Sequence, residues 1–320
     1  MSELSARPLL SSALDAELFV ARERQLEVLE RSARERLNVL VLGEAGAGKT
    51  SLLHRFERRL DDDEALAPVF VEGARGADTA EELLTLIARR LGGSPDPFGR
   101  RPTTGTEAAL VALADVRRAL AGAQQRVVLI LDELPNGALA ATLFGRLRDE
   151  LWSLPATWVV AAETADQAAY LRPPASAFFE TVLTVGPLPD DAGVELLRRR
   201  IPDAGDERLR KIATAAGGNP RHLIAGARDV LLDGRDLRQV TGARAEREER
   251  ARAVGEAAAR LVGYLEASGP ASASDERLLA ELGWSRSRAT QVLRDLEQAG
   301  LVAPVREQSG SGRRKVYALS

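Results

Sequence analysis

The most distinctive chemical feature of the sequence is a glycine-rich segment, residues 43–50, with the sequence GEAGAGKT. It fits the pattern G-x-x-x-x-G-K-[ST], whose glycines let backbone N–H groups turn inward toward phosphate oxygens. Lys49 would reach the β- and γ-phosphates as a point charge, and the Thr50 hydroxyl would bind Mg²⁺. The alternative is a plain glycine turn between a strand and a helix. From the match to the pattern we predict an ATP–Mg²⁺ site formed by Gly43, Glu44, Ala45, Gly46, Ala47, Gly48, Lys49, Thr50 and Ser51.

Lys49 stands out from the chain's other cations. Only three lysines occur, at positions 49, 211 and 315, whereas arginine supplies the other 41 basic side chains. Lysine and arginine are not equivalent where a compact point charge is needed. A lysine inside the glycine segment therefore fits the phosphate-binding interpretation.

Two carboxylates follow an apolar run. Residues 127–131 read VVLIL and are followed by Asp132 and Glu133. In P-loop proteins Asp132 would contact Mg²⁺ at the carboxyl end of the strand, and Glu133 would polarise the attacking water as a general base. The alternative is a strand that ends in a polar turn. The adjacent glutamate favours hydrolysis of ATP over transfer to another substrate.

The segments around these motifs alternate between strands and helices. Apolar, β-branched runs predict strands, and a 3.6-residue apolar period predicts helices. The alternation predicts a parallel sheet covered on both faces, an α/β P-loop core of the ASCE type. The PVFVE strand at 68–72 fits the same class, in which a strand separates the two motif strands. The predicted strands are 37–42, 68–72, 127–131, 157–161 and 181–185, and the predicted helices 22–36, 50–60, 79–91 and 107–120.

The second half of the chain is predicted to be mostly helical. Three helices after Pro187 (190–201, 206–216 and 220–232) would form an all-α lid, and the charged run 244–252 is either a linker or a solvated helix. Helices at 254–267, 275–282 and 286–299, strands at 301–305 and 315–319, and a loop at 307–314 follow the order of a winged helix-turn-helix. We expect a leader (1–18), an ATPase core (19–188), the lid (189–243), a charged linker or helix (244–253) and a winged helix (254–320).

The chain resembles AAA+ and STAND-type ATPases, above all archaeal replication-initiator-like and related bacterial ATPases. Residues 19–26 (FVARERQL) are similar to the "FVGRE-x-x-L" box near the adenine, with Ala21 in place of the usual glycine. Residues 217–221 (GGNPR) are similar to the "GGNPR" segment of the lid. The resemblance implies that Pro220 lies near the base and that Arg221 acts catalytically at the γ-phosphate as sensor 2. Alternatively, Arg221 caps or pairs locally.

Two further roles follow from the same resemblance. A polar sensor-1 residue is expected where the fourth strand ends, and Glu163 or Thr164 stands there, although an acidic residue departs from the family's usual Asn, Ser, Thr or Arg. An arginine finger, which acts on a neighbouring subunit, is expected before the fifth strand. Arg172 is the best placed, with a plain surface arginine as the alternative.

The C-terminal unit carries a local excess of positive charge. From Trp284 to the end there are seven cations and three carboxylates. Cations and amides on one helix face could contact base edges in a major groove, and a basic hairpin suits phosphates. We predict binding of double-stranded DNA through residues 284–315; packing or docking of a protein is the alternative. The residues concerned are Arg286, Arg288, Thr290, Gln291, Arg313, Arg314 and Lys315, with Asp295 and Glu297 opposing the contact.

Composition removes several classes of site. Cysteine is absent, which excludes disulfides and zinc–thiolate sites, and the only histidines are His54 and His222. No apolar run is long enough to cross a bilayer, and the N-terminus lacks the pattern of a secretory signal. We therefore expect a cytoplasmic protein without membrane contact.

The sequence thus predicts a slow ATPase that binds ATP or ADP and changes conformation between them. The main hypothesis couples this change to DNA binding through the winged helix. A second is a signalling or defence-type STAND switch whose winged helix contacts protein. A third is a transcription regulator with vestigial ATP binding. Whether a homo-oligomer or a protein partner is involved is left open.

Overall fold

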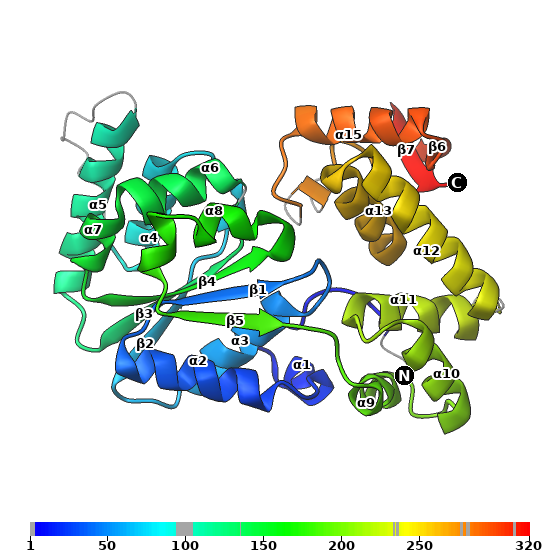
Figure 1. Ribbon diagram of the computed structural model, residues 1–320, viewed down its shortest axis with the longest axis horizontal. Coiled ribbons are helices and arrows are strands. Elements are labelled where there is room, and N and C mark those ends of the chain that lie inside the picture. The colour runs from blue at the N-terminus through cyan, green and yellow to red at the C-terminus, as the bar shows by residue number, and fades with distance from the viewer. Residues whose placement is uncertain are drawn as a thin grey trace.

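The computed structural model describes residues 4–93, 105–134, 136–232, 234, 237–275, 278–279, 282–309 and 312–320. At residues 75, 237–245, 267–268, 306–309 and 312–314 it describes the backbone alone. Figure 1 shows an α/β core on one side of the molecule, with helices and a C-terminal hairpin on the other. Among the described residues no helix combines the length and apolarity that a membrane span requires.

A five-stranded parallel sheet forms the core, as the sequence predicted, and its strand order is β2-β3-β4-β1-β5. Within it, Val41 faces Ala161 on one side and Leu183 on the other. Because all five strands run the same way, the carboxyl ends of the motif strands meet at one edge of the sheet. The strands are β1 (Val39–Gly43), β2 (Leu66–Phe70), β3 (Arg126–Asp132), β4 (Ala156–Glu163) and β5 (Thr181–Val185).

The strand that separates the two motif strands is β4. It pairs with β1 on one side and with β3 on the other, whereas β2 pairs only with β3 at the edge of the sheet. The prediction that the PVFVE strand lies between them was therefore wrong. The physical reason is burial: β4 is buried along nearly its whole length, while β2 is part-exposed and carries Pro68, which an edge strand tolerates.

Helices cover both faces of the sheet (Figure 1). Alternate strand residues enter two separate apolar clusters: Val39 and Val41 pack with Phe56, whereas Leu40 and Leu42 lie in the cluster of Phe144. A π-helical turn, Ala141–Arg146, lies in a helical region that the sequence did not reveal. One face carries α2 (Glu23–Glu35) and α3 (Lys49–Leu60), and the other α4 (Ala80–Arg90), α5 (Gly105–Ala121), α6 (Gly137–Ala140), α7 (Arg148–Trp152) and α8 (Gln167–Leu171).

Three helices follow the sheet, as predicted for the lid: α9 (Asp190–Arg200), α10 (Asp206–Ala215) and α11 (Pro220–Leu231). They share a core that includes Leu197, Leu209 and Leu223. Gly218, with φ +75°, passes so close to the backbone that an added Cβ would lie 2.2 Å from the Leu188 carbonyl oxygen. Only glycine allows the two backbones to approach so closely. This contact holds the lid against the segment that follows β5.

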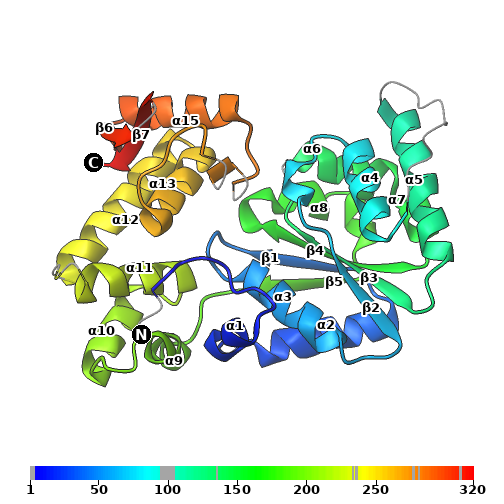
Figure 2. The ribbon, with the colours of Figure 1, turned by 180° about the vertical axis from the view of Figure 1, so that it is seen from behind.

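The N-terminal segment is more ordered than the predicted leader. Leu4 and Val20 are buried in the lid cluster, and the Leu4 carbonyl accepts a hydrogen bond from Arg228. A short helix, α1 (Ala13–Leu18), begins at Ser12, whose side chain accepts from the N–H of Asp15. The segment runs from the lid past the core, dark blue in Figure 2.

The C-terminal region has the order of the predicted winged helix. Its core includes Leu261, Trp284 and Leu293. The run 244–252 is helical, the strands extend over most of the predicted 307–314 loop, and of the predicted helix 275–282 residues 278–279 and 282 are helical, with its remainder partly outside the described residues. The elements are α12 (Leu237–Val254), α13 (Glu256–Ser268), α15 (Arg286–Gln298), and the antiparallel β6 (Val302–Ser309) and β7 (Gly312–Leu319).

Candidate nucleotide-binding site

The glycine segment joins β1 to α3 as a turn that depends on two left-handed glycines. Gly46 has φ +78° and Gly48 has φ +94°, a region that side chains with a Cβ rarely adopt. The first turn of α3 follows at once, so its N-terminus faces the loop. A helix N-terminus behind inward-turned amides is a site that attracts phosphate. The segment therefore has the backbone that the predicted ATP site requires.

Lys49 is held under this loop by three oxygen atoms. Its Nζ donates to the carbonyl oxygens of Gly43 at 3.0 Å and Glu44 at 3.1 Å, and lies 3.0 Å from Glu133 Oε1. The side chain is only 4% exposed. An ammonium group has three N–H donors, and these three oxygen atoms can accept all of them. The first turn of α3 and the end of β3 thus place the two predicted catalytic residues in contact.

The predicted magnesium ligands are also in contact. The Thr50 hydroxyl donates to Asp132 Oδ2 at 2.8 Å, which joins the start of α3 to the last residue of β3. A hydroxyl and a carboxylate are hard oxygen ligands of the kind that Mg²⁺ takes beside nucleotide phosphates. Their placement fits a magnesium ion at this edge of the sheet.

Glu133 has a backbone conformation that is rare for glutamate. Its φ is +61°, in the left-handed region, directly after β3 ends. Such strain costs on the order of 1–3 kcal/mol and persists only where the surrounding structure enforces it, often at functional sites. Here it keeps the carboxylate nearly buried and against Lys49. The sequence predicted the residue, whereas its backbone geometry is visible only in the structure.

Of the two sensor-1 candidates, Glu163 lines the pocket and Thr164 is exposed outside it. Burial and the neighbouring Glu133 raise the pKa of Glu163, while Arg260 and Lys49 oppose that shift. Arg172, the arginine-finger candidate, is exposed and does not line the pocket. An exposed position is compatible with either interpretation of Arg172.

The start of α11 closes the pocket over the loop. Asn219 caps the helix with its side-chain oxygen, and its Nδ2 donates to the Ala45 carbonyl at 3.0 Å. A Cβ added to Gly46 would lie 2.6 Å from the Cβ of Arg221, so only glycine lets the lid approach this closely. Pro220 and Arg221, the two residues that the prediction named in this segment, both line the pocket. Asn219, by contrast, was not singled out, although it stands inside the GGNPR segment.

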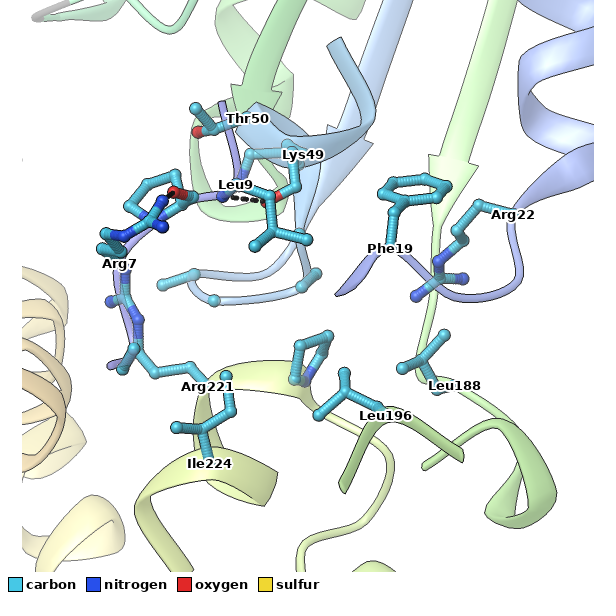
Figure 3. A pocket seen from close by; sticks show the side chains of 18 of the residues that line it. Arg7, Leu9, Phe19, Arg22, Lys49, Thr50, Leu188, Leu196, Arg221 and Ile224 are labelled. Carbon is cyan, nitrogen blue, oxygen red and sulfur yellow. Dashed lines mark hydrogen bonds between the residues drawn. The ribbon is translucent and has the colours of Figure 1, made fainter. Parts of the chain in front are cut away.

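Figure 3 shows how the pocket divides into two ends. Lys49, Thr50, Arg7 and Arg221 surround one end, where phosphates would lie. Phe19, Leu188 and Leu196 lie on the other side, together with Arg22, whereas Ile224 lies beside Arg221. A pocket that combines apolar side chains with convergent polar groups is typical of a cofactor site.

The box at residues 19–26 holds its conformation despite the missing glycine. Ala21 has φ +56° and Arg22 φ +72°, both in the left-handed region, which explains why a glycine is usual at position 21. Arg22 donates a short hydrogen bond to the Gly186 carbonyl, and Phe19 faces the pocket. The segment therefore lines the pocket with a backbone that is strained at Ala21 and Arg22.

The pocket also contains parts that the sequence did not predict, two of which lie far from the motifs in the chain. One is the N-terminal segment: residues 6–9 line it, and the N–H of Leu9 donates to the Ser51 hydroxyl at 3.0 Å. The other is Arg260 of α13, together with Leu282. The signal for Arg260 was slight: it is the single basic residue of an otherwise apolar and acidic helix.

The face predicted to contact DNA is exposed on α15. Arg286, Arg288, Thr290 and Gln291 are all exposed there. Gln291 donates to Asp295 at 2.8 Å. Lys315 pairs with Glu297 of α15 at 3.1 Å, and the side chains of Arg313 and Arg314 lie outside the described residues.

Residues 32–153 match the family described as "AAA domain". The match contains β1, the phosphate loop, α3 and the end of β3. Over these residues the chain matches an AAA domain, a type of P-loop NTPase domain, which implies that this part binds nucleotide.

Structures of archaeal proteins share this fold over nearly the whole chain, each with a TM-score of 0.52. They are the Aeropyrum pernix ORC1 protein in complex with DNA (21% identity; 94% of this chain and 89% of that chain covered), CDC6P from Pyrobaculum aerophilum (18%; 95% and 93%) and the Aeropyrum pernix ORC2 protein in ADPNP–ADP complexes (17%; 94% and 90%). At these identities the similarity concerns the fold alone. It confirms the predicted fold class. Comparison with curated proteins gave no match.

Proposed function

We propose that this chain is an ATPase switch that binds ATP–Mg²⁺ between the sheet edge and the lid and hydrolyses the γ-phosphate bond. The observation that carries the proposal is the convergence of Lys49, Glu133, Thr50 and Asp132 at one end of the pocket. They come from two distant parts of the sequence, the start of α3 and the end of β3, yet all four meet beside the glycine-rich loop.

The roles follow from the contacts. Lys49 would leave Glu133 to neutralise β- and γ-phosphate oxygens. Thr50 and Asp132 would hold a magnesium ion, which would neutralise charge that develops on the phosphates. Glu133, released from its ion pair, accepts a proton as a water oxygen attacks the γ-phosphorus. The bond to the β-phosphate oxygen breaks, giving ADP, phosphate and one proton. Arg221 at the start of α11 would contact the γ-phosphate, so that loss of phosphate loosens the lid.

We further propose that the chain divides into the core (19–188), the lid (189–243), a linking helix (244–253) and the winged helix (254–320). The nucleotide state of the first two parts sets how the last one meets double-stranded DNA. Support comes from the exposed cations of α15 and from the shared fold with a protein crystallised with DNA. Because phosphate contacts release counterions, such binding would weaken steeply with salt.

The alternative, a switch whose winged helix contacts protein, has its own support. Gln291 and Lys315 are both bonded to carboxylates of α15, which reduces what they offer to DNA. A mobility-shift titration at several salt concentrations, with ATP and Mg²⁺, separates the two. A concentration-dependent shift that weakens with salt supports DNA binding. The absence of any shift favours the protein-contacting switch.

Hydrolysis is tested with Glu133→Gln, which keeps the shape of the side chain and removes the base. We expect turnover to fall by about 10²–10³-fold while ATP remains bound. Glu35→Gln, an exposed glutamate at the end of α2, is the matched control and should hydrolyse ATP like the unmodified protein. Equal, slow hydrolysis by all three proteins would contradict the role of Glu133 and favour a regulator with vestigial ATP binding.

A further inference from the structure

One arginine of the C-terminal region reaches into the nucleotide pocket. Arg260 lies on α13, and its Nε is 3.0 Å from Oε2 of Glu163, the last residue of β4. The Arg260 side chain is 15% exposed and that of Glu163 only 9%. The same pocket is lined by Lys49 and Glu133. The contact therefore joins the winged-helix region to the phosphate end of the pocket in one chain.

The charges at this end of the pocket favour a cation at the position of Arg260. Glu133 and Glu163 are both buried there and act on each other electrostatically, and Lys49 is the cation paired with Glu133. Once Lys49 turns to phosphates, two carboxylates would face the added negative charge. Buried charge without a counter-charge is costly, so Arg260 becomes the cation that offsets them.

The Arg260 guanidinium also retains donors that suit an anion. Although Nε is close to Glu163, its N–H makes no hydrogen bond among the described residues, which means that the pair meets at a poor angle. One Nη donates weakly to the Leu282 carbonyl at 3.4 Å. A guanidinium carries five N–H donors in a planar fork that matches phosphate oxygens.

The Arg260 side chain is mechanically linked to α15. Trp284, which is buried just before that helix, has the guanidinium of Arg260 5.9 Å from its ring centre and that of Arg288 5.5 Å away. Leu282, whose carbonyl Arg260 contacts, also lines the pocket. A displacement of the Arg260 side chain would therefore affect the start of α15, the helix that carries the predicted DNA-contacting residues.

We propose that Arg260 is a positioning residue that recognises the terminal phosphate of a nucleoside triphosphate, and that its contact with Glu163 couples that phosphate to docking of the winged-helix region on the core. This proposal rests on the proposed function. The terminal phosphate supplies Arg260 with a second anionic partner, so the triphosphate favours the docked arrangement more than the diphosphate does.

The first test compares binding of ATP–Mg²⁺ and ADP–Mg²⁺ by titration calorimetry with the full chain. We expect Arg260→Ala to weaken ATP by about tenfold and ADP by less than about threefold, with Arg260→Lys in between. Arg294→Ala, an exposed arginine of α15, is the control and should change neither affinity. Equal effects of Arg260→Ala on both nucleotides, or none, would overturn the proposal.

The second test measures docking without reference to activity. Because the chain has no cysteine, Ala114→Cys on α5 and Gln298→Cys on α15 provide two exposed labelling positions. Electron–electron resonance between spin labels should give a narrow distance distribution with ATP–Mg²⁺, and a broad one when Arg260→Ala or Glu163→Gln is added. Unchanged distributions in both variants would overturn the coupling.

The two proposals fail in different ways. If the unmodified protein and Lys49→Ala bind ATP equally, or neither binds it, the nucleotide site is wrong and the role of Arg260 fails with it. If the unmodified protein binds ATP, Lys49→Ala does not, and Arg260→Ala distinguishes ATP from ADP as the unmodified protein does, only the role of Arg260 is wrong.

Discussion

Basic side chains are used differently in the nucleotide pocket and on α15. In the pocket, Lys49, Arg7 and Arg260 each lie against a buried carboxylate, namely Glu133, Asp15 and Glu163. On α15, Arg286 and Arg288 are exposed, and neither forms an ion pair with any described residue. Removing a pocket cation leaves a buried negative charge, whereas removing a cation of α15 should change the stability of the fold little and cost mainly what an external partner supplied.

Lys49→Ala tests the pocket side of this contrast and should have the largest effect. The variant loses the charge that meets the phosphates and leaves Glu133 facing them. We expect ATP–Mg²⁺ affinity, measured by calorimetry, to fall by at least about 100-fold. Lys211→Ala is the matched control, because Lys211 pairs with the exposed Glu207 on the lid and should not affect binding. Unchanged affinity in Lys49→Ala would contradict the assignment of residues 43–50 as the phosphate-binding loop.

Arg7→Ala extends the contrast to stability. Arg7 donates two hydrogen bonds, of 2.7 and 3.0 Å, to the buried carboxylate of Asp15, but is itself one-third exposed. Allowing for solvent screening, we expect the free energy of unfolding at neutral pH to fall by about 1–2 kcal/mol. Arg31→Ala, an exposed arginine of α2, should stay within about 0.5 kcal/mol of the unmodified protein in denaturant titrations.

The pH dependence of this difference has a definite sign. The hydrogen bonds from Arg7 lower the pKa of Asp15, although its burial acts in the opposite direction. A lowered pKa in the folded state gives stability that is present above the unfolded value of about 4 and lost as pH falls through the folded one. The gap between Arg7→Ala and the unmodified protein should therefore narrow at acid pH. A gap of constant size would show that Arg7 acts through packing alone.

The site residues that the sequence predicted are those that lie in short sequence motifs. Lys49 and Thr50 follow a glycine pattern, and Asp132 and Glu133 follow an apolar strand, so spacing alone identifies them. The three lid helices and the five strands were predicted for the same reason, because their apolar periods are clear.

The rest depends on contacts between distant segments. The position of β4 is set by burial on both faces, which a list of strands does not give. Arg260 meets Glu163 only because α13 folds back onto the core. The N-terminal segment has too short a helix to show a period, yet it lines the pocket through residues 6–9. Sequence patterns therefore identified the residues of the two motifs and of the GGNPR segment, and missed the N-terminal segment and Arg260.

Arg288→Ala tests the α15 side of the contrast and should have the smallest effect. The side chain is exposed, its contact with the described residues being the stacking on Trp284. We expect unfolding to change by no more than about 0.5–1 kcal/mol and DNA binding to weaken by about fivefold.

The salt dependence of binding then shows what Arg288 contacts. If it meets a phosphate, the slope of log affinity against log salt should fall by about one; a contact to a base edge would leave the slope closer to its original value. Arg210→Ala, an exposed arginine of α10, is the control for general loss of positive charge. If both variants bind DNA like the unmodified protein, the cations of α15 do not contact DNA. They would then be available to a protein partner. The cations of the pocket and those of α15 would then differ only in how much they contribute to stability.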